Sequence, residues 1–203
     1  MSGGDLIGLV LVVGVVGGFG ALVFLLVRGA RDRLTTFAAS VAAQFGITAI
    51  RTEGLTTVLE LTRPRWSGVL RAHGRPRSAV EILHFTGTAS TPKSAWSLTS
   101  KRMSPPDGPG VRVSLESRRL RDRYVVFAER PDELRGFFAD PDVEKWLILL
   151  DAGAAHALVG ALPGVAISVQ GTEISVMVSG QQGEDVEHLH RALLLIERVG
   201  EWG

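Results

Sequence analysis

The sequence predicts an α+β domain with a largely antiparallel sheet and packed helices, preceded by a single transmembrane helix. Two observations support this fold class. Residues 6–27 form an apolar run without a charged side chain. The strand-like segments after residue 47 follow one another and are then succeeded by helices, instead of alternating with them. A chain of 203 residues accommodates one anchor and one domain of ordinary size.

Residues 6–27 are expected to span a membrane. A helix of 22 residues is about 33 Å long, and the hydrocarbon core of a bilayer is about 30 Å thick. Residues 1–5 form a short N-terminal tail that contains Asp5, whereas Arg28, Arg31 and Arg33 follow the apolar run. The positive-inside rule therefore predicts an extracytoplasmic N-terminus and a cytoplasmic C-terminal domain, although large domains can be translocated regardless of flanking charge. The excess of arginine over lysine is typical of a GC-rich bacterium, which makes the inner membrane the expected location.

Small residues gather on one side of this predicted helix. Gly14, Gly17, Gly18 and Ala21 fall within a sector of about 100° around the helix axis. Gly14 and Gly18 form a GxxxG pair, and small residues permit the close backbone approach that drives helix association in lipid. This face is expected to pack against a second copy of the chain or another membrane protein. The simpler alternative is that glycine is frequent in membrane helices generally.

Residues 28–46 are expected to form an amphipathic juxtamembrane helix. Gly46 suits the position just after a helix end. Apolar side chains recur at helical spacing, and this stripe consists of Leu34, Phe37, Ala38, Val41 and Phe45.

The remaining residues, 47–203, are expected to form a soluble α+β domain. A loop is expected at 101–110, and a hairpin at 165–178 turns at Gln170–Gly171. Asp140 has the character of a helix N-cap, with Pro141 in the first helical position. The expected strands cover 56–61, 67–74, 78–87, 94–100, 110–117 and 123–129, and the expected helices cover 131–139, 140–150 and 184–202.

Two stretches of the domain carry a resemblance. They are GVLRAHGRPRSAVEILHF at 68–85 and RYVVFAERPDELRGFFADPDVEKWLILL at 123–150. In their order after the anchor and the basic helix, they resemble a loose group of uncharacterised bacterial membrane-anchored proteins of unknown function. The resemblance agrees with the α+β fold and implies no activity, ligand or site residue.

The sequence contains no recognisable catalytic or metal-binding motif. Cysteine is absent, which excludes disulfides, thiolate ligands and cysteine nucleophiles. His188 and His190 lie about 200° apart on the predicted helix, so they cannot chelate one metal as an i, i+4 pair does. His188 is expected to pair with Glu184 on the helix surface. No catalytic residue, metal or cofactor is therefore predicted.

The two halves of the chain have opposite charge. Residues 28–123 carry 17 basic and 7 acidic side chains, whereas residues 124–203 carry 5 and 13. A basic surface is expected from Arg63, Arg65, Arg71, Arg75 and Arg77. Aromatic residues are too few for a nucleic-acid stacking platform, so no nucleic-acid partner is expected. The two alternatives are contact with anionic membrane lipid and a solvated basic face that offsets the acidic half.

These observations favour a non-enzymatic, single-span scaffold or adaptor. It would assemble through the glycine-rich face of its transmembrane helix and through its cytoplasmic domain, as a homo-oligomer or with another membrane protein. The alternative is a membrane-tethered enzyme or small-ligand sensor with a pocket in the α+β domain.

Overall fold

The structure, a computed structural model, describes residues 28–29, 32–75, 78–103, 107–152, 164–179 and 185–202. Within these residues, no helix is both long and apolar enough to cross a membrane. The predicted span at 6–27 lies outside them, and so do Arg31 and Arg77.

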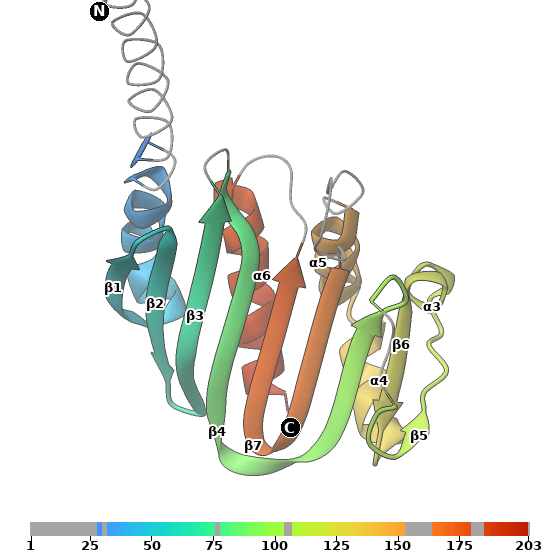
Figure 1. The fold of residues 1–203 in the computed structure, drawn as a ribbon. Coiled ribbons are helices and arrows are strands. Elements are labelled where there is room, and N and C mark those ends of the chain that lie inside the picture. The colour runs from blue at the N-terminus through green and yellow to red at the C-terminus, as the bar shows by residue number, and fades with distance from the viewer. Residues whose placement is uncertain are drawn as a thin grey trace, which may run out of the picture.

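The prediction of an α+β fold with a largely antiparallel sheet and packed helices is confirmed. The strand order is β1-β2-β3-β4-β6-β5, and β7 pairs with β4 (Figure 1). All of the strand pairings in the described chain are antiparallel. The strands are β1 (Ile47–Glu53), β2 (Thr56–Arg63), β3 (Trp66–Arg75), β4 (Ser78–Ser100), β5 (Val111–Arg112), β6 (Tyr124–Ala128) and β7 (Gly164–Ser179).

Strand β4 is long and curves around the β7 hairpin (Figure 1). Its first part pairs with β3 and with the second arm of β7, so that Thr86 lies opposite Ser175. Its second part pairs with the first arm of β7 and with β6. The hairpin turns at Gly171, whose φ of 57° lies in the left-handed region that favours glycine. The two separate strands predicted at 78–87 and 94–100 are therefore parts of one strand.

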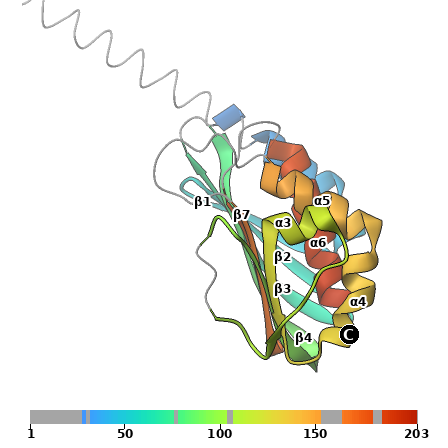
Figure 2. The ribbon, with the colours of Figure 1, turned by 90° about the vertical axis from the view of Figure 1, so that its right-hand side faces the viewer.

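The helices cover one face of this sheet (Figure 2). Helix α6 packs against both α5 and the sheet, and its Leu189, Leu193 and Ile196 are fully buried, on the face that the sequence predicted. The helices are a segment at 32–40, α2 (Ala42–Phe45), α3 (Arg118–Arg123), α4 (Pro131–Ala139), α5 (Pro141–Ala152) and α6 (Asp185–Glu201).

Two local predictions were wrong. His188 is only 4% exposed, so it does not lie on the helix surface, and Glu184 lies outside the described residues. The segment 110–117 is not a full strand, because only Val111 and Arg112 pair with β6. The short helix α3 follows it and was not predicted. Its N-cap is Ser117, whose hydroxyl accepts a hydrogen bond from the Leu120 amide at 3.3 Å.

The N-terminal helix is fixed to the domain. Leu34, Ala38 and Phe45 are fully buried, and Phe37 and Val41 are partly buried against the same core. The helix ends at Gly46, in the left-handed conformation, and the chain passes directly into β1. The apolar stripe predicted from the sequence is therefore the contact between this helix and the rest of the domain.

The sheet has two distinct ends, which orient the rest of the molecule. The N-terminal helix lies alongside the sheet and ends next to Ile47. Residue 28, at the start of the helix, therefore lies at the end of the sheet opposite to Ile47 (Figure 1). We call this opposite end the helix-entry end, and it also holds the pairs Arg75–Ser78 and Ser100–Tyr124. The other end, which holds Gly171 at the β7 turn, is the hairpin-tip end.

Candidate functional site

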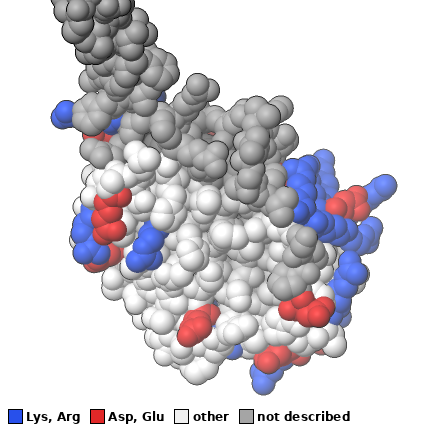
Figure 3. Space-filling view, in the orientation of Figure 1, with Lys and Arg blue, Asp and Glu red and all other residues white. Residues whose placement is uncertain are grey.

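No helix among the described residues covers the opposite face of the sheet, and at its β6 edge Gly108 of the loop after β4 packs on Phe127 (Figure 2). Because side chains alternate along a strand, the burial of Leu83 and Phe85 in the core places His84 and Thr86 on this open face. Charged side chains are sparse across its middle (Figure 3). The open face consists mainly of small polar and apolar groups, among them Ser67, Val69, Thr86, Thr88, Ser97, Thr99, Ser168, Ser175 and Met177.

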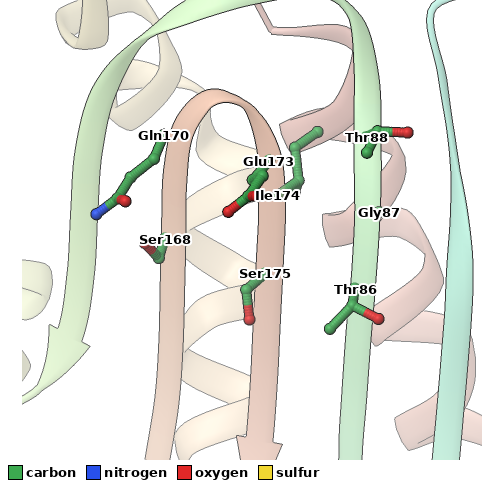
Figure 4. A pocket seen from close by; sticks show the side chains of 8 residues that line it. All are labelled: Thr86, Gly87, Thr88, Ser168, Gln170, Glu173, Ile174 and Ser175. Atoms are coloured by element: carbon green, nitrogen blue, oxygen red, sulfur yellow. The ribbon is translucent and has the colours of Figure 1, made fainter.

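A shallow pocket of about 430 Å³ lies beside the β7 hairpin. Both arms of the hairpin and the facing part of β4 contribute side chains to it (Figure 4). Its lining residues are Thr86, Gly87, Thr88, Ser168, Gln170, Glu173, Ile174 and Ser175. Hydroxyl and amide groups dominate, with one carboxylate and neither a cation nor an aromatic ring. The pocket can form hydrogen bonds with a neutral ligand, but it has no group that would hold an anion.

One contact beside this pocket has the elements of a nucleophile and a base. Ser175 Oγ lies 3.5 Å from Nε2 of His84. Burial lowers the pKa of His84, and the neighbouring Arg71 and His73 lower it further. In a catalytic triad a carboxylate orients the histidine and stabilises the imidazolium that forms. Here the charged neighbour is the guanidinium of Arg71, which opposes that charge, so the arrangement does not support nucleophilic catalysis.

A second hollow, of about 640 Å³, lies where the end of α6 meets the start of α4. Two of its cations, Lys93 and Arg198, make structural contacts. Lys93 Nζ donates to the last carbonyls of α6, including that of Gly200 at 2.9 Å, and so caps the helix. Arg198 pairs with Asp140 at 2.8 Å and lies over the ring of Trp202. These contacts close the end of the helix against the sheet.

A buried polar network joins the sheet to α5. Asp151 is 2% exposed and accepts a hydrogen bond from the Ser100 hydroxyl at 2.7 Å. Its other oxygen accepts from the guanidinium of Arg123 at 3.1 Å. The Tyr124 hydroxyl donates to the carbonyl of Leu147 at 2.7 Å. Every group is satisfied by a protein partner, which identifies the network as a structural tie between β4, β6 and α5.

Replacing Asp151 with alanine is expected to lower the free energy of unfolding by about 2 kcal/mol. The Ser100 hydroxyl loses its acceptor, while Arg123, whose side chain is 38% exposed, can still turn to water. Thermal unfolding of the full chain in mild detergent, followed by tryptophan fluorescence, measures the change. Asp142→Ala, at an exposed position on the same helix, is the matched control and is expected to stay within about 0.5 kcal/mol of the parent.

The arginines predicted to form one basic surface are placed apart. Arg63 is half-buried and donates to the carboxylate of Glu197 on α6 and to the carbonyl of Gln44. Arg65 is exposed at the hairpin-tip end, and Arg71 lies on the open face. Arg75 ends β3 at the helix-entry end. The structure therefore does not bring these four together.

Of the arginines after the predicted span, two are described. Arg28 is exposed and forms an i, i+4 pair with Asp32 at 3.9 Å. Arg33 is exposed on the same helix. Within the described parts of the chain, no group of three or more histidines and acidic side chains is placed to hold a metal ion.

The fold and surface together define a two-layer α+β domain with one open sheet face. No family model matches the chain, and no curated protein matches it. A solved structure that it does match is the mycobacterial trehalose monomycolate transport factor A, TtfA, over 84% of this chain and 96% of that one. The sequence identity is 10% and the TM-score is 0.41, and this likeness is too low to transfer fold or function.

Proposed function

We propose that the protein is a single-span adaptor of the bacterial inner membrane, without enzymatic activity of its own. Residues 6–27 would be the anchor, and the α+β domain would be a cytoplasmic platform. The observation that supports this role best is the attachment of the N-terminal helix. Leu34, Ala38 and Phe45 bury it in the core, and Arg63 bridges its last turn to α6.

This attachment has a mechanical consequence. A domain joined to its anchor through a flexible linker could take any orientation. A helix packed along the core restricts the orientation of the domain relative to residue 28. A fixed orientation suits a scaffold, because it presents the same surfaces to the bilayer and to neighbouring membrane proteins. The Ser175–His84 contact does not favour an enzyme, because no carboxylate in the described residues forms a hydrogen bond or ion pair with His84.

Assembly would occur through the glycine face of the anchor. Replacing both Gly14 and Gly18 with leucine is expected to abolish association between two copies, because the bulky side chains keep the helix backbones apart. Two differently tagged copies are co-expressed, and recovery of the second tag from native membranes in mild detergent is measured.

Gly8→Leu with Gly20→Leu is the matched control, because these two glycines lie off the face and carry the same change in bulk. The control is expected to retain association. If the Gly14 and Gly18 variant also recovers the second tag at the level of the parent, assembly does not depend on this face.

A further inference from the structure

Six basic side chains gather at the helix-entry end of the sheet. Four come from α3, and Lys101 and Arg102 come from the turn after β4. The two segments are adjacent because the Lys101 amide donates to the carbonyl of Arg123 at 2.8 Å. A dense group of basic side chains is visible at the right-hand edge of the molecule in Figure 3. We call this cluster the α3 surface, and its members are Lys101, Arg102, Arg118, Arg119, Arg121 and Arg123.

Most of this charge is not compensated. Arg123 is paired with Asp151, and Arg118 lies 3.8 Å from Asp122. The other four, Lys101, Arg102, Arg119 and Arg121, are exposed and have no acidic partner among the described residues. The one remaining acidic neighbour on this segment is the exposed Glu116. Four unpaired cations within two adjacent segments form a surface that attracts an extended anionic partner.

The α3 surface lies at the same end of the domain as residue 28. Strand β4 ends at Ser100, next to Tyr124, at the helix-entry end, and α3 immediately precedes Tyr124. The N-terminal helix reaches this end as well (Figure 1). A membrane entered by residues 6–27 would therefore lie on the side of the domain that carries the α3 surface.

We infer that the α3 surface contacts the anionic phospholipid headgroups of the membrane that holds the anchor. The inference rests on the proposed function, since it requires the anchor at 6–27. Each basic residue near an anionic leaflet strengthens attachment by about fivefold. Together with the packed N-terminal helix, this second attachment would fix the domain against the bilayer at two separate points.

The test uses the full chain in lipid nanodiscs. The chain has no native cysteine, so Glu116→Cys places one fluorophore beside the α3 surface and Thr172→Cys places one at the hairpin-tip end. Quenching of each fluorophore by a quencher attached to lipid headgroups is compared between phosphatidylcholine discs and discs containing phosphatidylglycerol. We expect at least threefold stronger quenching at position 116 in the anionic discs, lost at about 0.5 M salt, and no lipid dependence at position 172.

Two charge variants, each made in the Glu116→Cys background, make the test specific. Glutamine at Lys101, Arg102, Arg119 and Arg121 is expected to abolish the effect of anionic lipid. The matched control places glutamine at four exposed cations outside α3 and the turn after β4, Arg51, Arg65, Arg130 and Lys145, and is expected to keep it.

The outcomes separate the two proposals. A chain that does not co-elute with phosphatidylcholine discs has no anchor, which overturns the proposed function and this inference with it. A chain that enters both kinds of disc with equal quenching at position 116 overturns the inference alone. Equal loss of quenching in both charge variants also overturns it, because net charge and not the α3 surface would then be responsible.

Discussion

Replacing Gly200 with alanine is expected to lower the free energy of unfolding by about 3 kcal/mol, although alanine favours a helix over glycine by about 1 kcal/mol. Gly200 lies in the last turn of α6, directly over the indole ring of Trp66. A Cβ atom at this position would lie 2.5 Å from Cδ1 of that ring. The steric cost therefore exceeds the gain in helix propensity.

The ring cannot move away, because the residues behind it are also closely packed. Trp66 is 3% exposed and meets the ring of Phe85 edge to face, with 5.6 Å between the ring centroids. Phe85 in turn fills the space over Gly68 and Gly87, where an added Cβ would lie 2.5 Å from its ring. The rings of Trp66 and Phe85 thus occupy the volume that the three glycines leave free. A methyl group added at Gly200 would push Trp66 against Phe85, and Phe85 against the backbone at Gly68 and Gly87.

A double-mutant cycle identifies this mechanism. Trp66→Leu alone leaves a cavity and is expected to destabilise, but in that background Gly200→Ala is expected to stabilise the protein, because the methyl group now enters the cavity. Gly29→Ala is the control, since a Cβ added to that helical glycine would meet no neighbouring atom within 4 Å. Thermal unfolding in detergent measures the melting temperature of each variant. A change of 1 kcal/mol in unfolding free energy corresponds to a shift of about 2–4 °C. An unchanged cost of Gly200→Ala in the Trp66→Leu background would contradict the mechanism.

The sequence alone was enough to predict an element whose structure is determined by the residues within that element. The β7 hairpin follows from strict alternation around Gln170–Gly171, and α4 and α5 follow from their first-turn prolines and the cap of Asp140, whose side chain accepts from the Asp142 amide at 2.9 Å. It was not sufficient for β4. Gly87 and Pro92 indicate a turn locally, but pairing with the hairpin holds the strand together through the bend.

The α3 surface was missed for a related reason. Helix α3 has six residues and buries one of them, Leu120, in the core. A single apolar residue gives no helical periodicity, so the arginines of α3 could not be assigned to a helix or to one of its faces. Lys101 and Arg102 are separated from it by more than a dozen residues and join it only through pairing of β4 with β6. The arginines from Arg63 to Arg75 form one run in the sequence, but strand alternation and the hairpins distribute them over opposite faces and ends of the sheet.

Acid is expected to destabilise the protein through His188. The side chain is 4% exposed, and its Nε2 has no hydrogen-bond partner among the described residues. Burial, with a smaller contribution from Arg191, lowers its pKa from 6.5 to about 4. The folded protein therefore holds the neutral imidazole, whereas the unfolded chain takes up a proton below pH 6.5. Stability contributed by this residue is complete above pH 6.5 and is lost as the pH falls toward 4.

The expected loss from this one group is about 2 kcal/mol between pH 7 and pH 5, and about 3 kcal/mol by pH 4. Carboxylates also contribute to acid unfolding, so the comparison is made between variants at each pH. His188→Phe and His188→Gln remove the titrating group with an apolar and a polar side chain, and both are expected to show a shallower fall in unfolding free energy than the parent. Agreement between them separates titration from packing. If both fall as steeply as the parent, the buried imidazole is not the acid-sensitive element of this fold.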